Sequence, residues 1–206
     1  MAARAFDLIE TMRFEALDGF VDLERHLERM KTSAELLGFA FNRHDCRNDL
    51  QAATFRLTED ARIRLLLSRS GALAIEVRPM PVRPAQPVDV AIVPLPVAAD
   101  DPRLAHKTTD RAFLDDARRA AGTFEVIFAR PDGLLTEGSF TNLFVEREGI
   151  LVTPRPGSLM NGILRQALIE RGEAIESDVR PTDLQDGFFI GNSLRGLIAA
   201  RLLPTA

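Results

Sequence analysis

Residues 136–166 read TEGSFTNLFVEREGILVTPRPGSLMNGILRQ, and this stretch decides how the second half of the chain is organised. The run FTNLFVEREGILVT is typical of a β-hairpin, and the loop TPRPGSLMNG leads from it to a helical pattern between Gly162 and Arg171. Backbone N–H groups at a helix start bind anions, and glycine lacks the Cβ that would keep a phosphate at a distance. We therefore expect a phosphate-binding helix start at Gly162, with an ordinary glycine-containing loop as the alternative.

A lysine stands in the segment DPRLAHKTTDRAFLDD, residues 101–116, although the chain contains only two lysines among its 26 basic Lys and Arg residues. Only lysine offers an amine that attacks carbonyls and aldehydes, so an enzyme that binds a carbonyl compound covalently has to keep this residue type. Lys107 is therefore a candidate nucleophile, and a solvated loop lysine is the alternative. The other lysine, Lys31, is expected to be a surface charge beside a helical stripe.

The totals of the chain favour a globular protein that acts on small molecules. Its 206 residues are 46% hydrophobic, which suits one domain or two small ones. The net charge of −4 comes from intermixed acids and bases, so we expect no nucleic-acid partner. One cysteine, Cys46, forms no internal disulfide and favours a reducing compartment, so we expect a cytoplasmic protein. We also expect no membrane segment, no signal peptide and no metal site.

The apolar spacing of the first half predicts a small α+β unit. The run FDLIETMRF alternates like a strand, and an apolar helical stripe follows, with Asp22 capping its start and Gly38 ending it. A second helical pattern comes next, and RIRLLLSRSGALAIEVRP is typical of a hairpin around a Ser70–Gly71 turn. The two helical stripes consist of Leu23, Leu27, Met30, Ala34 and Leu37, and of Cys46, Leu50, Ala53 and Leu57.

Seven prolines between residues 79 and 102 mark extended chain and indicate a domain junction near residues 94–102. We therefore expect a small N-terminal α+β domain over residues 1–98 and a second domain over residues 99–206. The second domain is predicted to contain a helix over about 110–121 ended by Gly122, the strand FEVIFA, a turn at residues 131–133, the hairpin and the helix described above. The strand VDVAIV precedes the junction.

Four blocks of this sequence, RHLERMKTSA, HKTTDR, TEGSFTNLF and NGILRQ, together resemble the class IV pyridoxal-phosphate-dependent aminotransferase family, and most of all its 4-amino-4-deoxychorismate lyases. The resemblance covers nearly the whole chain and keeps the order of the blocks. It implies an α+β class and a two-domain fold with a small α/β sandwich-like N-terminal domain and a C-terminal pseudo-barrel domain that binds the cofactor. Only MAARA precedes FDLIETMR, so we expect an N-terminally shortened first domain.

The resemblance also implies a cofactor, pyridoxal 5'-phosphate, and a role for each matching residue. Lys107 would form the Schiff base and move protons, and Glu137 would pair with the pyridine nitrogen. Arg29 would contact the phosphate. At the helix start, the site would be completed by Gly162 and by the amides of Ile163 and Leu164.

Weaker matches concern the remaining contacts to the cofactor. Met160 would pack on one face of the ring, and plain loop packing is the alternative. Asn192 and Ser193, in the run GNS, would add polar contacts, and a simple turn is the alternative.

Three residues are candidates for substrate binding. Strand alternation places Thr11 and Arg13 on one side of the first strand, from which related enzymes line their substrate pocket. Arg64, on the hairpin, matches a basic position near the substrate in several relatives, and a solvated arginine is the alternative.

The residues in these blocks resemble those of the lyases and favour the lyase reaction. In this reaction Lys107 would remove the proton from the amine-bearing carbon of 4-amino-4-deoxychorismate. Pyruvate leaves and 4-aminobenzoate remains, a step of folate biosynthesis. Two alternatives stay open: a class IV aminotransferase acting on branched-chain or D-amino acids, and a non-catalytic protein that binds the cofactor or a partner. The resemblance implies a homodimer, and the opening FDLIETMRFE adds a chorismate-aminating enzyme as a further partner.

Overall fold

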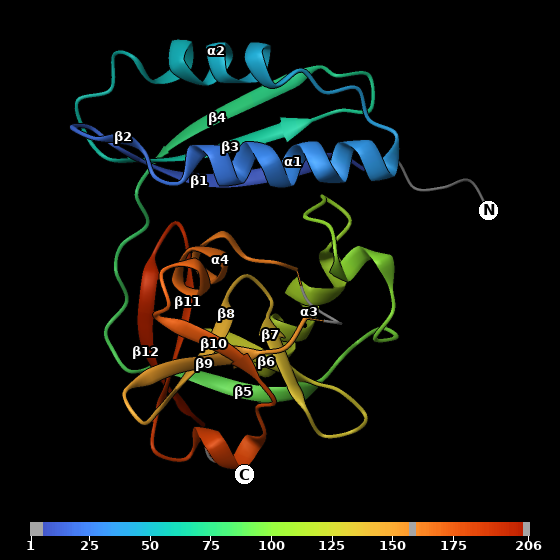
Figure 1. Ribbon diagram of the computed structural model, residues 1–206, viewed down its shortest axis with the longest axis vertical. Coiled ribbons are helices and arrows are strands. Elements are labelled where there is room, and N and C mark those ends of the chain that lie inside the picture. The colour runs from blue at the N-terminus through green and yellow to red at the C-terminus, as the bar shows by residue number, and fades with distance from the viewer. Residues whose placement is uncertain (1–5, 157–159, 204–206) are drawn as a thin grey trace. The chain divides into compact units, whose positions relative to one another are not determined.

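The computed structural model describes residues 6–156 and 160–203 and contains two compact units, each with its own hydrophobic core (Figure 1). The first unit comprises Met1–Val82 and His106–Asp110, and the second comprises Arg83–Ala105 and Arg111–Ala206. The sequence places the junction later, near residues 94–102. The structure differs because the strand over Val88–Pro94 is hydrogen-bonded to strands of the second unit.

The first unit is an antiparallel four-stranded sheet with two helices packed on one of its faces. The strand order is β2-β1-β3-β4. Its core joins alternate strand residues, such as Met12 and Ile63, to Leu27 and Met30 of the first helix and to Leu50 of the second. The elements are β1 (Leu8–Glu15), β2 (Gly19–Phe20), α1 (Leu23–Leu37), α2 (Arg43–Thr54), β3 (Ala61–Leu67) and β4 (Leu73–Pro79).

Local spacing predicts most of this unit correctly. The hairpin pairs Ile63 with Val77, as expected, and α1 ends at Gly38, whose φ of 72° is the left-handed conformation that favours glycine. The capping role of Asp22 is wrong. This residue has a φ of 53° and makes no side-chain cap; its carboxylate accepts from Arg25 Nε at 3.3 Å instead. A capping side chain needs an extended backbone at that position, which the left-handed turn denies it.

The second helix of the unit begins one turn earlier and ends sooner than its apolar stripe indicates. Asn42 caps it, because its Oδ1 accepts from the amides of His44 and Asp45. The helix ends at Thr54, so Leu57 lies outside it, although it packs against the same core.

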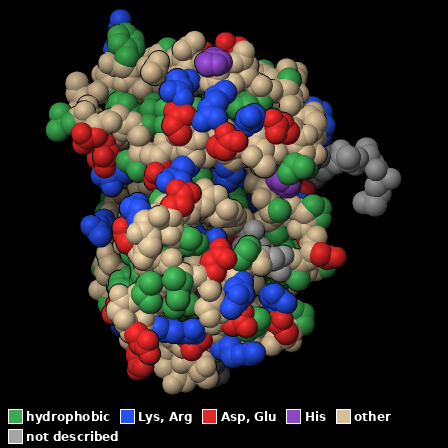
Figure 2. All heavy atoms as spheres, viewed as in Figure 1, with side chains coloured by type: hydrophobic (Ala, Val, Ile, Leu, Met, Phe, Trp, Pro, Cys, Tyr) green, Lys and Arg blue, Asp and Glu red, His purple; other side chains and the backbone are tan. Residues whose placement is uncertain are grey.

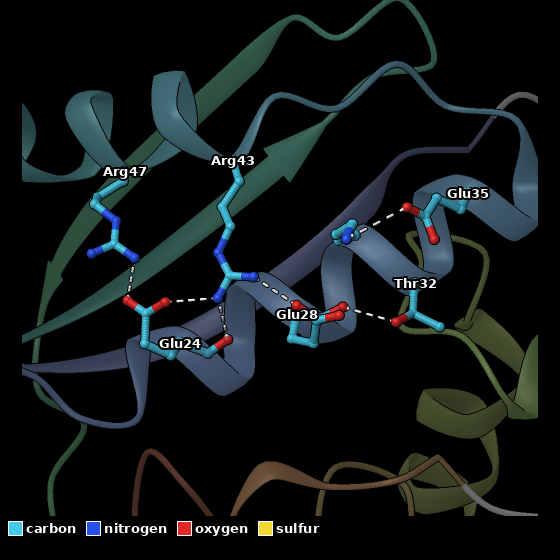
Figure 3. Close-up of polar contacts among 7 residues, drawn as sticks. Glu24, Glu28, Thr32, Glu35, Arg43 and Arg47 are labelled. Atoms are coloured by element: carbon cyan, nitrogen blue, oxygen red, sulfur yellow. Dashed lines mark hydrogen bonds and ion pairs between the residues drawn. The ribbon is translucent and has the colours of Figure 1, made fainter.

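Ion pairs on the outer surface connect α1 with α2 (Figure 3). Arg43 donates to Glu28 at 2.6 Å and to Glu24 at 2.7 Å, and Arg47 also donates to Glu24. These side chains are largely exposed, so the pairs orient the helices more than they stabilise them. The face drawn in Figure 2 has acidic and basic side chains interspersed in the same manner.

The second unit is a curled eight-stranded sheet in the order β10-β9-β8-β11-β12-β5-β6-β7. The expected strands, the 110–121 helix, the hairpin and the later helix are all present, and the helix α3 ends at Gly122 as expected. The bounds are β5 (Val88–Pro94), α3 (Ala112–Ala121), β6 (Glu125–Ala129), β7 (Leu135–Gly138), β8 (Asn142–Arg147), β9 (Ile150–Pro154), α4 (Ile163–Glu170), β10 (Ala174–Ser177), β11 (Phe188–Asn192) and β12 (Gly196–Leu202), with 3₁₀ turns at Pro102–Leu104 and Pro181–Leu184.

Three apolar clusters hold the second unit together. The largest joins residues of seven strands with Leu184 of the second 3₁₀ turn. A second cluster packs Leu114 of α3 against Val126 and Phe128 of β6. A third packs Leu168 of α4 against Phe144 of β8. The helix α4 is therefore fixed on the strand that follows the β7–β8 turn, and this fixes the position of its N-terminal end.

Candidate active site

Lys107 lies on a short extended segment that is hydrogen-bonded to the edge of β1 in the first unit. Ile9 N donates to Lys107 O at 2.9 Å, and Thr109 N donates to Asp7 O at 2.9 Å. Asp7 N in turn donates to Thr109 Oγ1 at 2.9 Å. This stretch of β1 is the part that β2 leaves open, since β2 pairs only with residues 14 and 15. The backbone of Lys107 is therefore held as an edge strand.

The register of this segment decides which face of the sheet carries the lysine. Leu8 and Thr108 form an antiparallel bridge, and both are buried. Leu8 belongs to the core under the helices. Because successive strand residues alternate between faces, Lys107 lies across from Ile9 on the opposite, helix-free face. Lys107 itself is half-buried.

The helix-free face also carries the three predicted substrate residues. Thr11 and Arg64 lie directly opposite each other in the β1–β3 register. Arg13 follows two residues further along β1, where it pairs with Glu15 and Asp60 at 3.0 Å each. The first unit thus brings Thr11, Arg64 and Lys107 to one face, and it occupies Arg13 with two carboxylates.

Arg29, the predicted phosphate contact, lies on the helix-covered side of the same sheet. Its Nε donates to Glu10 Oε1 at 2.8 Å and its Nη2 donates to Glu10 Oε2 at 2.6 Å. His26 Nδ1 lies 2.7 Å from the same Oε2. Glu10 is only 2% exposed and His26 is fully buried. A bidentate carboxylate therefore fixes the plane of the Arg29 guanidinium.

The charges of this cluster follow from burial and proximity. Burial alone would raise the pKa of Glu10, but Arg29 and His26 outweigh it and hold that pKa far below its usual range. Burial lowers the pKa of His26, and the carboxylate of Glu10 works against this fall. Sequence reasoning missed Glu10 and His26. The sequence contained a signal for Glu10, because this acid stands at a position of the alternating strand where the side chain faces the core.

In the second unit, Glu137 of β7 has its carboxylate held by two neutral donors. Met160 N donates to Oε1 and Asn142 Nδ2 donates to Oε2, each at 2.9 Å. Glu137 is 9% exposed. The donors come from the loop before α4 and from the first residue of β8, so the acid is fixed at the point where three elements meet. Met160 contributes its backbone to this arrangement.

Asn142 also explains why residue 162 is glycine. A Cβ on Gly162 would lie 1.7 Å from Asn142 Oδ1. The sequence suggested that the missing Cβ leaves room for a phosphate, but the amide of Asn142 fills that space. The backbone of Gly162 is extended, with φ −70° and ψ 142°, so close approach rather than a special conformation requires glycine.

The start of α4 has no described side chain as a cap. Gly162 is its N-cap residue, and Gln166 N makes the first intrahelical bond, to Gly162 O at 2.9 Å. The amides of Ile163 and Leu164 precede that bond, and amides at these positions have no acceptor within a helix. Together with the helix dipole they form a donor set that suits an anion.

Asn192 is a turn residue. Its Oδ1 accepts from the amides of Leu194 and Arg195 at 3.1 and 3.0 Å, and its Nδ2 donates to Phe140 O at 3.1 Å. The side chain ties the β11–β12 turn to the loop before β8. Ser193 lies on this turn and is half-buried.

A second buried acid, Glu125 of β6, organises the loop between Glu137 and Asn142. Burial raises its pKa, and hydrogen bonds from the loop work against this rise. The carboxylate accepts from Ser139 N and Oγ, Phe140 N, Thr141 Oγ1 and Val126 N, at 2.7 to 3.0 Å. Arg111 donates to the carbonyl of Ser139. Nothing in the sequence pattern indicated this role, because the donors from the loop are 14 to 16 residues away from Glu125.

The described residues show neither a cluster of metal ligands nor a helix that could cross a membrane. They contain no group of three or more His, Cys, Asp or Glu that could hold a metal ion. None of the helices in residues 6–156 and 160–203 is long and apolar enough to cross a membrane.

Comparison with known proteins adds a family and several relatives. The family model described as amino-transferase class IV matches residues 7–203. A Schizosaccharomyces pombe protein classed as an aminodeoxychorismate lyase is 28% identical over 164 residues, 76% of this chain and 71% of the relative.

Solved structures are similar over nearly the whole chain. A Mesorhizobium loti protein classed as an amino-acid aminotransferase gives a TM-score of 0.88 at 34% identity, covering 96% of this chain and 100% of that one. A hypothetical aminotransferase from Mycobacterium tuberculosis, with α-ketoglutarate and PMP bound, gives 0.85 at 25% identity, covering 100% and 85%. The expected α+β fold is confirmed by these similarities.

Proposed function

Because the chain belongs to the class IV aminotransferase family, whose members are pyridoxal-phosphate-dependent, we propose that it is a 4-amino-4-deoxychorismate lyase. The reaction releases pyruvate and leaves 4-aminobenzoate, with pyridoxal 5'-phosphate as cofactor and Lys107 as the reactive amine. The observation that carries the proposal is the carboxylate of Glu137, buried and held by Met160 N and Asn142 Nδ2 beside an uncapped helix start.

The residues of the second unit fit this cofactor. A buried carboxylate with neutral donors can accept from a protonated ring nitrogen, and the amides of Ile163 and Leu164 can donate to a phosphate. Bound pyridoxal phosphate supplies an aldehyde that condenses with amines and a ring that withdraws electrons. Glu137 would hold a proton on the ring nitrogen of the bound cofactor, and Met160 orients Glu137 through its backbone.

The residues of the first unit supply the amine and a cation. Lys107 has its backbone fixed by Ile9, so its amine reaches from a rigid strand edge rather than from a mobile loop. In the lyase reaction this amine takes the proton from the amine-bearing carbon of the substrate. Arg29, oriented by Glu10, adds the cation that a phosphate dianion requires.

Two kinds of evidence support the lyase reaction over transamination. The relative from Schizosaccharomyces pombe is classed as a lyase, and the blocks KTTDR, NGILRQ and IGNSL resemble lyases. An aminotransferase is the second candidate, because the 34% identical Mesorhizobium loti chain is classed as one.

The cofactor assignment predicts which lysine carries the cofactor. Protein incubated with pyridoxal phosphate and reduced with borohydride should gain the cofactor mass on the peptide that contains Lys107, and Lys107→Ala should lose it. Lys31→Ala is the matched control, because Lys31 is an exposed surface residue paired with Glu35. Labelling of Lys31, or none in the unmutated protein, would contradict the proposal.

The reaction is tested by coupling the protein to a chorismate-aminating enzyme and measuring 4-aminobenzoate. Incubation with D- and L-amino acids and 2-oxoglutarate tests transamination in parallel. A product from the amino acids and none from the coupled assay would replace the lyase by the aminotransferase, and neither product would leave a binding protein.

A further inference from the structure

Three arginines lie in one row across the helix-free face of the first sheet. Arg13 of β1 is directly opposite Arg62 of β3, and Arg62 is directly opposite Arg78 of β4. Like charges at opposite positions of neighbouring strands destabilise a sheet. The repulsion within such a row has to be offset by carboxylates of the protein or by an anion that binds there.

Compensation within the protein is incomplete at the centre of the row. Arg13 has Glu15 and Asp60, and Arg78 has Glu76 at 2.6 Å. Arg62 makes no hydrogen bond or ion pair with any described residue, and its Nε is buried without a partner. The central cation therefore has unused donors on a face that already carries excess positive charge.

Arg64, two residues further along β3, likewise makes no hydrogen bond or ion pair with a described residue. It lies between Thr11 and Glu76 in the register, yet Glu76 Oε1 accepts from Arg78. The Nε of Arg64 is also buried without a partner among the described residues. Arg62 and Arg64 are thus two neighbouring guanidinium groups on one strand that form no hydrogen bond or ion pair with a described carboxylate, and Glu76, whose charge reaches both of them, is hydrogen-bonded to Arg78.

We propose that Arg62 and Arg64 together bind the two carboxylates of a dianionic substrate and make Arg62 a specificity-determining residue. This rests on the proposed function, which places the reacting amine on Lys107. Residues two apart on a strand are about 7 Å apart on the same face. Lys107 is level with Ile9, Arg64 with Thr11 and Arg62 with Arg13. The face therefore presents an amine and two guanidinium groups at successive levels.

This arrangement selects against substrates with apolar side chains. A branched-chain amino acid has one carboxylate, so it would leave one half-buried guanidinium without a carboxylate partner, which costs free energy. A substrate with two carboxylates matches both forks, and guanidinium groups bind carboxylates in bidentate geometry.

The test measures ligand binding to Arg62→Gln. Chorismate serves as a dicarboxylate probe without the reacting amine and benzoate as a monocarboxylate probe, both by calorimetry. Losing one charged bidentate contact should weaken chorismate binding at least about tenfold, and benzoate binding should change much less. Arg56→Gln is the matched control, because it removes the same charge from an exposed arginine of the first unit that lies outside this row. It should retain chorismate affinity.

If Arg62 only stabilised the sheet, Arg62→Gln would lower the thermal midpoint of the ligand-free protein. The proposal predicts the opposite. Removing the central charge relieves repulsion with Arg13 and Arg78, so the thermal midpoint of ligand-free Arg62→Gln should equal or exceed that of the unmutated protein. Arg62→Lys keeps the charge without the fork and should bind chorismate with intermediate affinity. Chorismate affinity that is unchanged in Arg62→Gln, or reduced equally in Arg56→Gln, would overturn the proposal.

Cofactor labelling separates this inference from the proposed function. Borohydride trapping on Lys107 should be the same in Arg62→Gln as in the unmutated protein. Normal trapping together with unchanged chorismate binding would refute only the role of Arg62. Absence of trapping in the unmutated protein would refute the cofactor assignment.

Discussion

At the scale of single residues, Asn142 connects more of the candidate site than any residue singled out from the sequence. Its Nδ2 donates to Glu137, and its Oδ1 occupies the space next to Gly162. One amide thus links the acid on β7 with the start of α4. An asparagine at the first position of a strand gives no sequence signal for this, because both partners come from other elements.

Gly162→Ala should destabilise the second unit and weaken cofactor binding. The new Cβ would lie 1.7 Å from Asn142 Oδ1, so the amide has to move and release Glu137. Overpacking of this kind costs about 1–3 kcal/mol, to be measured by urea unfolding. The double variant Gly162→Ala with Asn142→Ala removes the obstructing amide and should recover part of that stability without restoring cofactor affinity. Unchanged stability in Gly162→Ala would contradict the tight contact.

At the scale of elements, β1 gives different functions to its two faces. Even-numbered residues such as Glu10 and Met12 face the helices, and odd-numbered residues such as Thr11 and Arg13 face the other way. A shift of one residue would exchange the two sets. The seven aligned pairs between β1 and β3 exclude that shift. The packing of the core therefore determines that Lys107 pairs with Ile9 and not with a neighbouring residue of β1.

The link between β1 and α1 should make the protein sensitive to acid. The folded-state pKa of Glu10 is below its ordinary value of 4.5, so its ionised form stabilises the fold above that pH and the stabilisation is lost as the pH falls further. Glu10→Gln should lose about 3–5 kcal/mol at pH 7, because it leaves the buried side of Arg29 uncompensated. Below pH 4.5 its free energy of unfolding should fall less steeply than that of the unmutated protein.

Urea unfolding at several pH values between 7 and 3.5 measures this difference. The control is Glu24→Gln, which removes an exposed carboxylate whose pKa is lowered by hydrogen bonding to Arg43, and it should change stability much less. In the unmutated protein, burial lowers the pKa of His26, so protonation of this residue also reduces stability as the pH falls below about 6.5. Parallel pH profiles for Glu10→Gln and the unmutated protein would refute a charged Glu10.

Elements with regular spacing could be predicted from the sequence, and those that depend on a distant partner could not. The hairpin around Gly71 and the helix ending at Gly38 follow from local periodicity and glycine. The four-residue strand β10 pairs in parallel with β9 across a helix, and four residues are too few to show a pattern. Asp22 is not a cap because its backbone is left-handed, a conformation that the residue type alone does not reveal.

The same distinction holds for the candidate site. Lys107 and Glu137 could be proposed because each stands in a block with a recognisable residue type. The unmatched forks of Arg62 and Arg64 became visible only with the register of three strands. Glu10 could not be assigned because a buried acid is favourable only beside cations whose positions the fold decides.

At the scale of the whole molecule, the chain enters the first unit twice. It passes to the second unit after Val82, returns for His106–Asp110, and leaves again at Arg111. The block HKTTDR therefore contributes Lys107 to one unit and Arg111 to the other, where Arg111 donates to Ser139 O. Prolines marked extended chain near residues 94–102, but they could not show that β5 pairs with β6 and β12.

The return of residues 106–110 sets a rule for recombining this chain with its relatives. An exchange of residues 1–82 alone would give the segment around Lys107 a foreign partner strand. This follows because Ile9 N donates to Lys107 O and Thr109 N donates to Asp7 O. A chimera designed to transfer substrate preference has to import the pentapeptide together with the donor's β1, although a hundred residues of sequence separate the two.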